Sequence, residues 1–107
     1  SGATQEMQVT VTKNGKRPVL ELAGRFEFNT HHEFRTAVDS LWIDLDLVAV
    51  TIDFSEVDYL DSLALGMLLM LRDKMGSAKK EVILAWAHGN VKQVFDLANF
   101  GKLFRIA

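Results

Sequence analysis

The hydroxyl of Ser62 is the group in this sequence most suited to chemistry, because it follows Asp61 at the start of an apolar segment. Ser and Asp are favoured N-cap residues, since their oxygens accept hydrogen bonds from the unpaired N–H groups of a first helical turn. If Asp61 caps the helix, Ser62 stays exposed in that turn. The free N–H groups and the positive dipole end would also accommodate a phosphoryl group. The pair therefore predicts either a plain cap or a modifiable serine.

Three carboxylates are expected near this serine. Asp58 and Asp61 are close to it in sequence, and Glu27 lies in a segment that we expect to form a loop able to approach it. Phosphorylation would add about −1.5 to −2 charges beside them. Such a change would repel an acidic or apolar partner surface while the fold survives.

Catalytic and metal chemistry find little support elsewhere in the chain. Serine hydrolysis needs a general base and an oxyanion hole, and no Gly-x-Ser-x-Gly elbow surrounds Ser62. His88 could approach it from a strand end, although a turn histidine is more often only solvated. His31 and His32 are adjacent, so on a helix they diverge by about 100° and cannot readily chelate one ion. We expect no enzyme activity, no catalytic residue, no metal and no cofactor.

The larger aromatic side chains are expected to pack in the core or anchor loops: Phe26, Phe28, Phe34, Trp42 and Trp86.

The pattern of apolar residues predicts strands that alternate with helices. Met7–Thr12 and Pro18–Ala23 form a hairpin around Asn14-Gly15. A loop at 24–29 is expected next, followed by a helix capped by Asn29 or Thr30 and ending near Leu41. A strand at Leu47–Phe54 and a connection at Ser55–Leu60 lead to a helix from Ser62 to about Gly76. The last elements are a strand at Val82–Ala87, a helix capped by Asn90 and ending near Ala98, and a short strand at Leu103–Ile106. We predict an α/β fold, with a mixed, mostly parallel sheet of four to five strands, an N-terminal hairpin and about three helices packed on it.

The predicted helix that begins at Ser62 is apolar on more than one side. At about 100° per residue, one face should pack on the sheet: Ala64, Leu68, Leu71 and Met75. A second stripe to one side holds Leu63, Met67 and Met70 and ends at Lys74, and an outward stripe holds Ser62, Gly66, Leu69 and Asp73. The excess of apolar residues is typical either of a partner-binding surface or of a helix enclosed by its neighbours.

Composition limits the functional classes further. The 107 residues favour one domain, which we place at 6–107, with 1–5 as a flexible N-terminus or cloning scar. The formal net charge of −2 and the lack of a basic stripe argue against direct nucleic-acid binding. No apolar run reaches the roughly 18 residues that span a bilayer. The absence of cysteine is consistent with the cytoplasm, where we expect the protein to be found.

Residues 51–66, TIDFSEVDYLDSLALG, resemble the signature of STAS domains of the anti-sigma factor antagonist family. That signature is a hydrophobic strand followed by Asp-Ser-Ser-Gly-Leu-Gly at a helix start. The resemblance extends to the hairpin, the Gly24 loop, the later strand and the closing segment from Val91 to Phe104. Here Leu63 and Ala64 replace the family's second Ser and first Gly, so Ser62 is the one hydroxyl of the motif.

The resemblance implies a partner switch. In the family, the serine after the Asp is phosphorylated by an anti-sigma factor that doubles as a serine kinase, which points to Ser62. The unphosphorylated form binds that anti-sigma factor and frees the sigma factor, and a PP2C-type serine phosphatase reverses the modification. Gly24-Arg25-Phe26-Glu27 matches the family's Gly-Glu-Leu-Asp loop, with Glu27 at the acidic position.

The partner surface is expected around these residues: Glu27, Phe28, Asn29, Asp58, Tyr59, Asp61, Leu63, Gly66, Leu69 and Met70. The free protein is expected to be a monomer, and no membrane association is expected. The alternative within the same fold is a sensory or scaffolding STAS module that binds a small ligand or a larger signalling assembly.

Overall fold

The computed structural model describes residues 7–12, 14–42 and 46–107, and it confirms the expected α/β fold. The residues expected to be a flexible N-terminus or scar, 1–5, lie outside the described part. In chain order the elements are β1 (Gln8–Thr12), β2 (Val19–Phe26), a 3-10 turn η1 (Phe28–Thr30), α1 (His31–Leu41), β3 (Ala49–Leu60), α2 (Ser62–Ser77), β4 (Glu81–Ala85), α3 (Gly89–Leu97), a second 3-10 turn η2 (Phe100–Lys102) and β5 (Arg105–Ile106).

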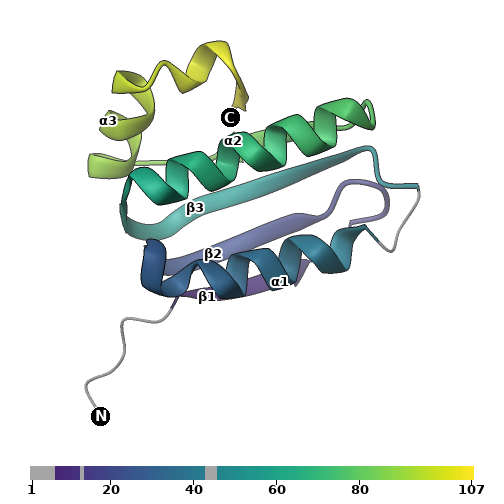
Figure 1. Ribbon diagram of the computed structural model, residues 1–107, viewed down its shortest axis with the longest axis horizontal. Helices are drawn as coiled ribbons and strands as arrows, with labels where there is room; N and C mark the ends of the chain where they lie inside the picture. Colours follow the sequence, from purple (N-terminus) through teal and green to yellow (C-terminus); the bar gives the residue numbers. More distant parts are fainter. Residues whose placement is uncertain (1–6, 13, 43–45) are drawn as a thin grey trace.

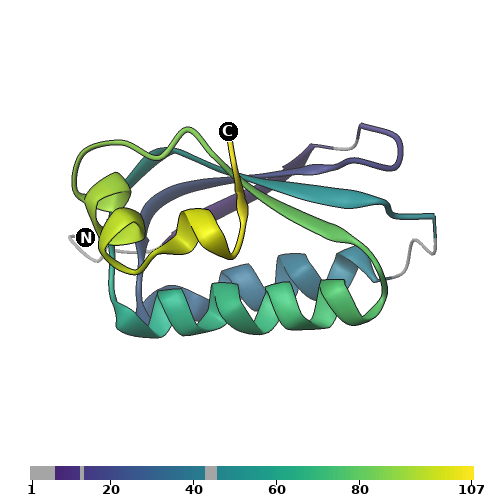
Figure 2. The same ribbon diagram turned by 90° about the horizontal axis from the view of Figure 1, so that it is seen from above.

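The described residues form one five-stranded sheet in the order β1-β2-β3-β4-β5 (Figure 1). The hairpin β1–β2 is antiparallel, and every later pair is parallel. Each parallel step crosses over through a helix and moves one strand further in the same direction. Because such crossovers share one hand, their helices lie on the same face of the sheet. Figure 2 shows this, with α1 and α2 side by side beneath the strands.

The core lies between the sheet and this helical layer. Leu20, Ile52 and Phe54 from the strands are fully buried, and Leu68 of α2 is buried against them. The predicted inner face of α2 is confirmed, since Ala64, Leu68, Leu71 and Met75 are its buried residues. Phe95 of α3 also packs in this core, with its ring centroid 5.1 Å from the ring centroid of Phe54 in an edge-on arrangement. α2 is therefore fixed on the sheet along its whole length.

The connection predicted at Ser55–Leu60 is wrong, because these residues continue β3 as far as Leu60. β2 also extends past Gly24 to Phe26, into the predicted loop, and the two extensions pair with each other. Register shifts on either side of the Ala23–Gly24 segment break the simple alternation of the pattern. The polar residues Ser55, Glu56 and Asp58 are typical of a loop in sequence, but in the structure they are exposed positions of the strand, and Val57 and Leu60 are buried.

Smaller differences concern the ends of elements. β4 stops at Ala85 rather than Ala87 because Trp86 has φ of 60°, a left-handed conformation that ends the strand. Trp86 is also 56% exposed, so its expected packing role is not observed. His88 rather than Asn90 is the N-cap residue of α3, whose first residue is Gly89. Thr30 is the N-cap residue of α1, but its hydroxyl makes no capping hydrogen bond.

Candidate phosphorylation and partner-binding site

The candidate site is built around the junction between β3 and α2. Asp61 has an extended backbone and caps α2, with its Oδ1 accepting a hydrogen bond from Ala64 N at 2.9 Å. Ser62 is the first residue of the helix and its side chain is exposed. Within the part of the chain that the structure describes, no group forms a hydrogen bond with the Ser62 hydroxyl. The aspartate therefore fills the capping role, and the serine is free for another one.

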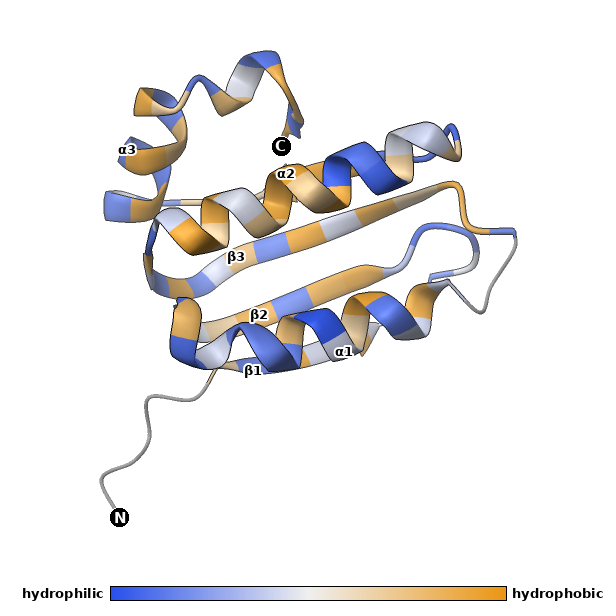
Figure 3. Ribbon diagram, viewed as in Figure 1, coloured by the Kyte–Doolittle hydropathy of each residue, from blue (hydrophilic) through white to orange (hydrophobic). Residues whose placement is uncertain are grey.

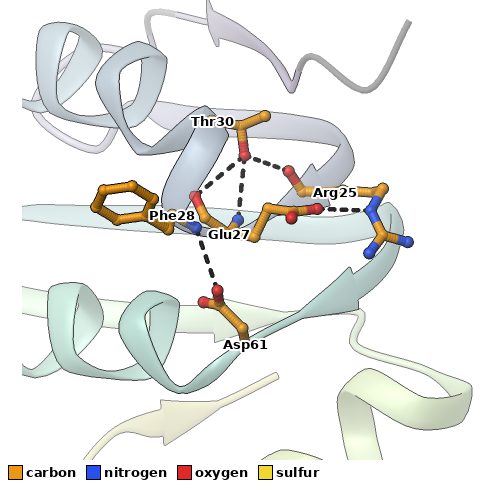
Figure 4. A network of polar contacts seen from close by, with 5 residues as sticks. All are labelled: Arg25, Glu27, Phe28, Thr30 and Asp61. Atoms are coloured by element: carbon orange, nitrogen blue, oxygen red, sulfur yellow. Dashed lines mark hydrogen bonds and ion pairs between the residues drawn. The ribbon is translucent and has the colours of Figure 1, made fainter. Parts of the chain in front are cut away.

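The second oxygen of Asp61 joins α2 to the loop after β2. Its Oδ2 accepts a hydrogen bond from the backbone N of Phe28 at 3.2 Å, and the Asp61 N donates to the carbonyl of Phe26 at 3.3 Å. The expected approach of this loop to the helix start is therefore observed. It takes place through the backbone of Phe26 and Phe28, and Figure 4 shows the bond between Phe28 and Asp61.

Arg25 at the end of β2, Glu27 and Thr30 of η1 hold one another in place (Figure 4). Thr30 is buried, and its hydroxyl donates to the carbonyl of Arg25 at 2.5 Å while accepting from the backbone N of Glu27 at 3.1 Å. Arg25 Nε donates to Glu27 Oε2 at 2.6 Å. This network shapes the turn so that the Phe28 ring points away from the Arg25–Glu27 pair.

Glu27 is accordingly not a free negative charge. The hydrogen bond to Glu27 raises the pKa of Arg25, so this guanidinium stays charged beside the carboxylate. Arg25 also lies over the ring of Tyr59, with its Cζ 4.0 Å from the ring centroid. The Arg25 contacts were not predicted. Tyr59 is 34 positions further along the chain than Arg25, and the only local signal in the sequence was the spacing of Arg25 and Glu27, which are two positions apart.

Apolar side chains surround the junction. Phe28 is 63% exposed, Leu63 is 40% exposed and Met70 is 72% exposed. Figure 3 shows the N-terminal half of α2 coloured mainly as apolar, with strongly hydrophilic residues following toward its C-terminal half. Of the two readings of this helix, exposure of part of its apolar surface is observed, because Leu63 and Met70 have no covering element in the described structure.

The predicted partner residues lie on three elements and the segments between them, from the junction of β3 and α2 to the middle of α2. They come from η1 and the residue before it, from the end of β3, from the cap and from α2. The exposed members are Phe28, Asn29, Asp58, Tyr59, Leu63 and Met70, and the half-buried ones are Glu27, Asp61, Gly66 and Leu69.

Two of the three histidines make local contacts. His31 stacks on Phe28 and its Nδ1 lies 2.5 Å from the Phe28 carbonyl. His88 Nε2 lies 2.9 Å from the carbonyl of Ser55, so this turn residue ties α3 to β3. Among the described residues there is no group of His, Cys, Asp and Glu side chains suited to hold a metal ion. In the same residues, no helix has the length and hydropathy needed to cross a membrane.

Comparison with known proteins gives the class. A family model described as "Mlab, STAS domain" matches residues 9–105. The STAS-domain containing protein PA14_20770 of Pseudomonas aeruginosa (strain UCBPP-PA14) is 36% identical over 94 residues, which are 88% of this chain and 91% of that protein. The chain therefore belongs to the STAS domain family.

Solved structures share this fold. An anti-sigma factor antagonist from Mycobacterium paratuberculosis has a TM-score of 0.84 at 22% identity, covering 97% of this chain and 87% of that one. The unphosphorylated form of the anti-sigma factor antagonist SpoIIAA has a TM-score of 0.72 at 13% identity, covering 94% and 87%. The phosphorylated form of the Bacillus cell fate determinant SpoIIAA has a TM-score of 0.72 at 15% identity, covering 94% and 91%. At these identities the likeness establishes the fold.

Proposed function

We propose that this protein is an anti-sigma factor antagonist that works as a phosphorylation-controlled partner switch. The unphosphorylated form binds an anti-sigma factor with serine-kinase activity, and binding releases the sigma factor. The kinase then phosphorylates Ser62, which blocks the complex, and a PP2C-type phosphatase restores the binding form. The chain itself performs no catalysis in this scheme, and it acts as a cytoplasmic monomer when free.

The observation that carries this proposal is the division of roles between two adjacent residues. Asp61 satisfies the N–H group of Ala64, so a kinase can modify the exposed hydroxyl of Ser62 without removing the cap. A phosphoryl group there meets the positive end of the α2 dipole, which favours an anion and protects the fold. The structures of SpoIIAA in its phosphorylated and unphosphorylated forms support the same chemistry on this fold.

The same phosphate is unfavourable for binding. It lies beside Leu63, whose side chain is 40% exposed, and next to the carboxylate of Asp61. A partner that covers Leu63 would remove water from the phosphate dianion. Without a positive charge to pair with it, burying this group is costly. Phosphorylation at Ser62 therefore weakens partner binding more than it affects folding.

The proposal is tested with purified serine-kinase anti-sigma factors from the source organism. With ATP, mass spectrometry should find one phosphate, at Ser62. Without ATP, wild type and Ser62→Ala should form a complex, whereas Ser62→Asp should lose it and keep its melting temperature. Thr36→Asp, which places the same charge on the exposed side of α1, is the matched control and should still bind. Phosphate at another hydroxyl, or normal binding by Ser62→Asp, would refute the switch.

A further inference from the structure

A groove runs between α1 and α2 on the side of these helices that faces away from the sheet. It has a volume of about 460 Å³. Its apolar lining comes from η1 and both helices, and comprises Phe28, Phe34, Val38, Leu63, Met67, Met70 and Leu71. Charged and polar side chains on its rim are His31, Arg35, Asp39 and Lys74.

The groove is long and open rather than enclosed. Its lining on α2 extends from Leu63 to Lys74, eleven positions that correspond to about 16 Å of helix. That length matches about three turns of a second helix. Met70 is 72% exposed and Phe28 is 63% exposed, whereas a small-molecule site usually buries most of its ligand. The dimensions favour a helix as the occupant.

The groove is continuous with the proposed switch. Leu63, which lines one end, is the residue directly after Ser62, and Phe28 donates its backbone N–H to Asp61. An occupant that fills this end of the groove would contact Leu63, the residue directly after Ser62. Methionine side chains such as Met67 and Met70 adapt their shape easily, which suits a surface that must accept and release a partner.

The charged side chains along the groove are mostly positive. Arg35 stands exposed on the α1 rim, and no carboxylate pairs with it in the described part of the chain. Lys74, at the end far from Ser62, lies over the ring of Trp42 with its Nζ 4.6 Å from the ring centroid. Among the described residues that line the groove, Asp39 is the one acidic side chain. Arg35 and Lys74 outnumber it, and acidic side chains of the occupant would complement them.

We propose that this groove holds an amphipathic helix of the anti-sigma factor, about three turns long. Its apolar residues recur at i, i+3 or i+4, and i+7, and acidic side chains lie toward Arg35 and toward Lys74. The inference rests on the proposed function and specifies the partner segment that phosphorylation displaces. A phosphate on Ser62 acts at the end of the groove where the apolar lining begins.

Binding of the anti-sigma factor is measured without ATP for four variants. Met70→Glu should weaken binding at least about tenfold, since it puts a charge in the apolar contact, and Arg35→Glu should weaken it about fivefold or more. Leu97→Glu, at a residue 85% exposed on α3, and Lys102→Glu on η2 are the matched controls and should change affinity less than about twofold. Normal binding by both groove variants, with Ser62→Asp still inactive, overturns the groove and leaves the switch standing. Failure of wild type to bind any anti-sigma factor overturns both.

The occupant is identified by cross-linking. Because the chain has no cysteine, Met70→Cys offers a single site for a thiol-directed photo-cross-linker. Mass spectrometry should place the cross-link in an amphipathic helix of the anti-sigma factor, and the Leu97→Cys control should not give that product. A cross-link to a loop or strand contradicts the inference. A cross-link between two copies of this chain also contradicts the inference. In that case light scattering should show that Met70→Glu converts a dimer to a monomer.

Discussion

At the scale of single residues, the junction works because one carboxylate makes two different hydrogen bonds. Asp61 accepts from Ala64 N at 2.9 Å, which begins α2, and from Phe28 N at 3.2 Å, which joins the loop to the helix. The neighbouring Ser62 contributes to neither bond. A serine that capped the helix itself would lose that cap when phosphorylated. The separation of the two roles lets modification change the surface while the backbone beneath it stays in place.

Asp61→Ala should lower the free energy of unfolding by about 1–2 kcal/mol, because the cap and the bond to the loop are both lost. Asp61→Asn should lose less, since its amide oxygen still accepts one of the two bonds. The measurement is urea unfolding, with the midpoint compared at constant m-value. The control is Asp73→Ala, which should change stability little. Asp73 is exposed on α2, and its Oδ1 lies 3.5 Å from Arg72 Nη1. Equal stability of Asp61→Ala and wild type would show that the cap contributes nothing.

At the scale of elements, α2 separates folding from binding on two sides of one helix. Leu68 is fully buried on the sheet side, and Met70 is 72% exposed beside the groove. Two positions apart on a helix, these side chains diverge by about 200°. The helix can therefore present an apolar surface to a partner without weakening its own attachment to the sheet.

Leu68→Ala should destabilise the protein by about 2–5 kcal/mol, because it removes buried methyl groups and leaves a cavity. Met70→Ala should cost less than about 0.5 kcal/mol, as expected for a surface position. Thermal and urea unfolding measure both values. A large loss for Met70→Ala would mean that this side chain packs in the free protein, and it would remove the basis for treating it as a binding residue.

The elements also show how far sequence reasoning reaches. α2 and its buried face were predicted because a 3.6-residue period is local and visible over four turns. The extension of β3 to Leu60 was not, because its pairing partner at Phe26 is 34 positions away and polar residues interrupt the pattern. The site shows the same limit. Asp61 and Ser62 were found from capping chemistry, whereas the contact between Arg25 and Tyr59 depends on the strand register.

At the scale of the whole molecule, crossovers that all run in one direction put the helices on one face and make β3 the central strand. The first half of β3 pairs with β2 on one side and β4 on the other, whereas its second half pairs with β2 in the described structure. The candidate site therefore lies at the end of β3 that pairs on one side in the described structure. Partner exchange at the site can leave the central pairing intact.

Native-state hydrogen exchange should reveal this gradient. The slowest amides are expected between Val50 and Phe54, because these residues are flanked by strands and covered by the helical layer, so that only global unfolding exposes them. The two-residue edge strand β5 at Arg105–Ile106 should exchange faster, and the Phe28 amide, which depends on the single bond to Asp61, should open locally. Exchange is followed by NMR at increasing sub-denaturing urea. Asp61→Ala should accelerate the Phe28 amide by more than its loss of global stability accounts for. If the Phe28 amide and the core amides of wild type exchange with the same free energy of opening, the loop and the core unfold as one unit. The site would then not open independently of the rest of the fold.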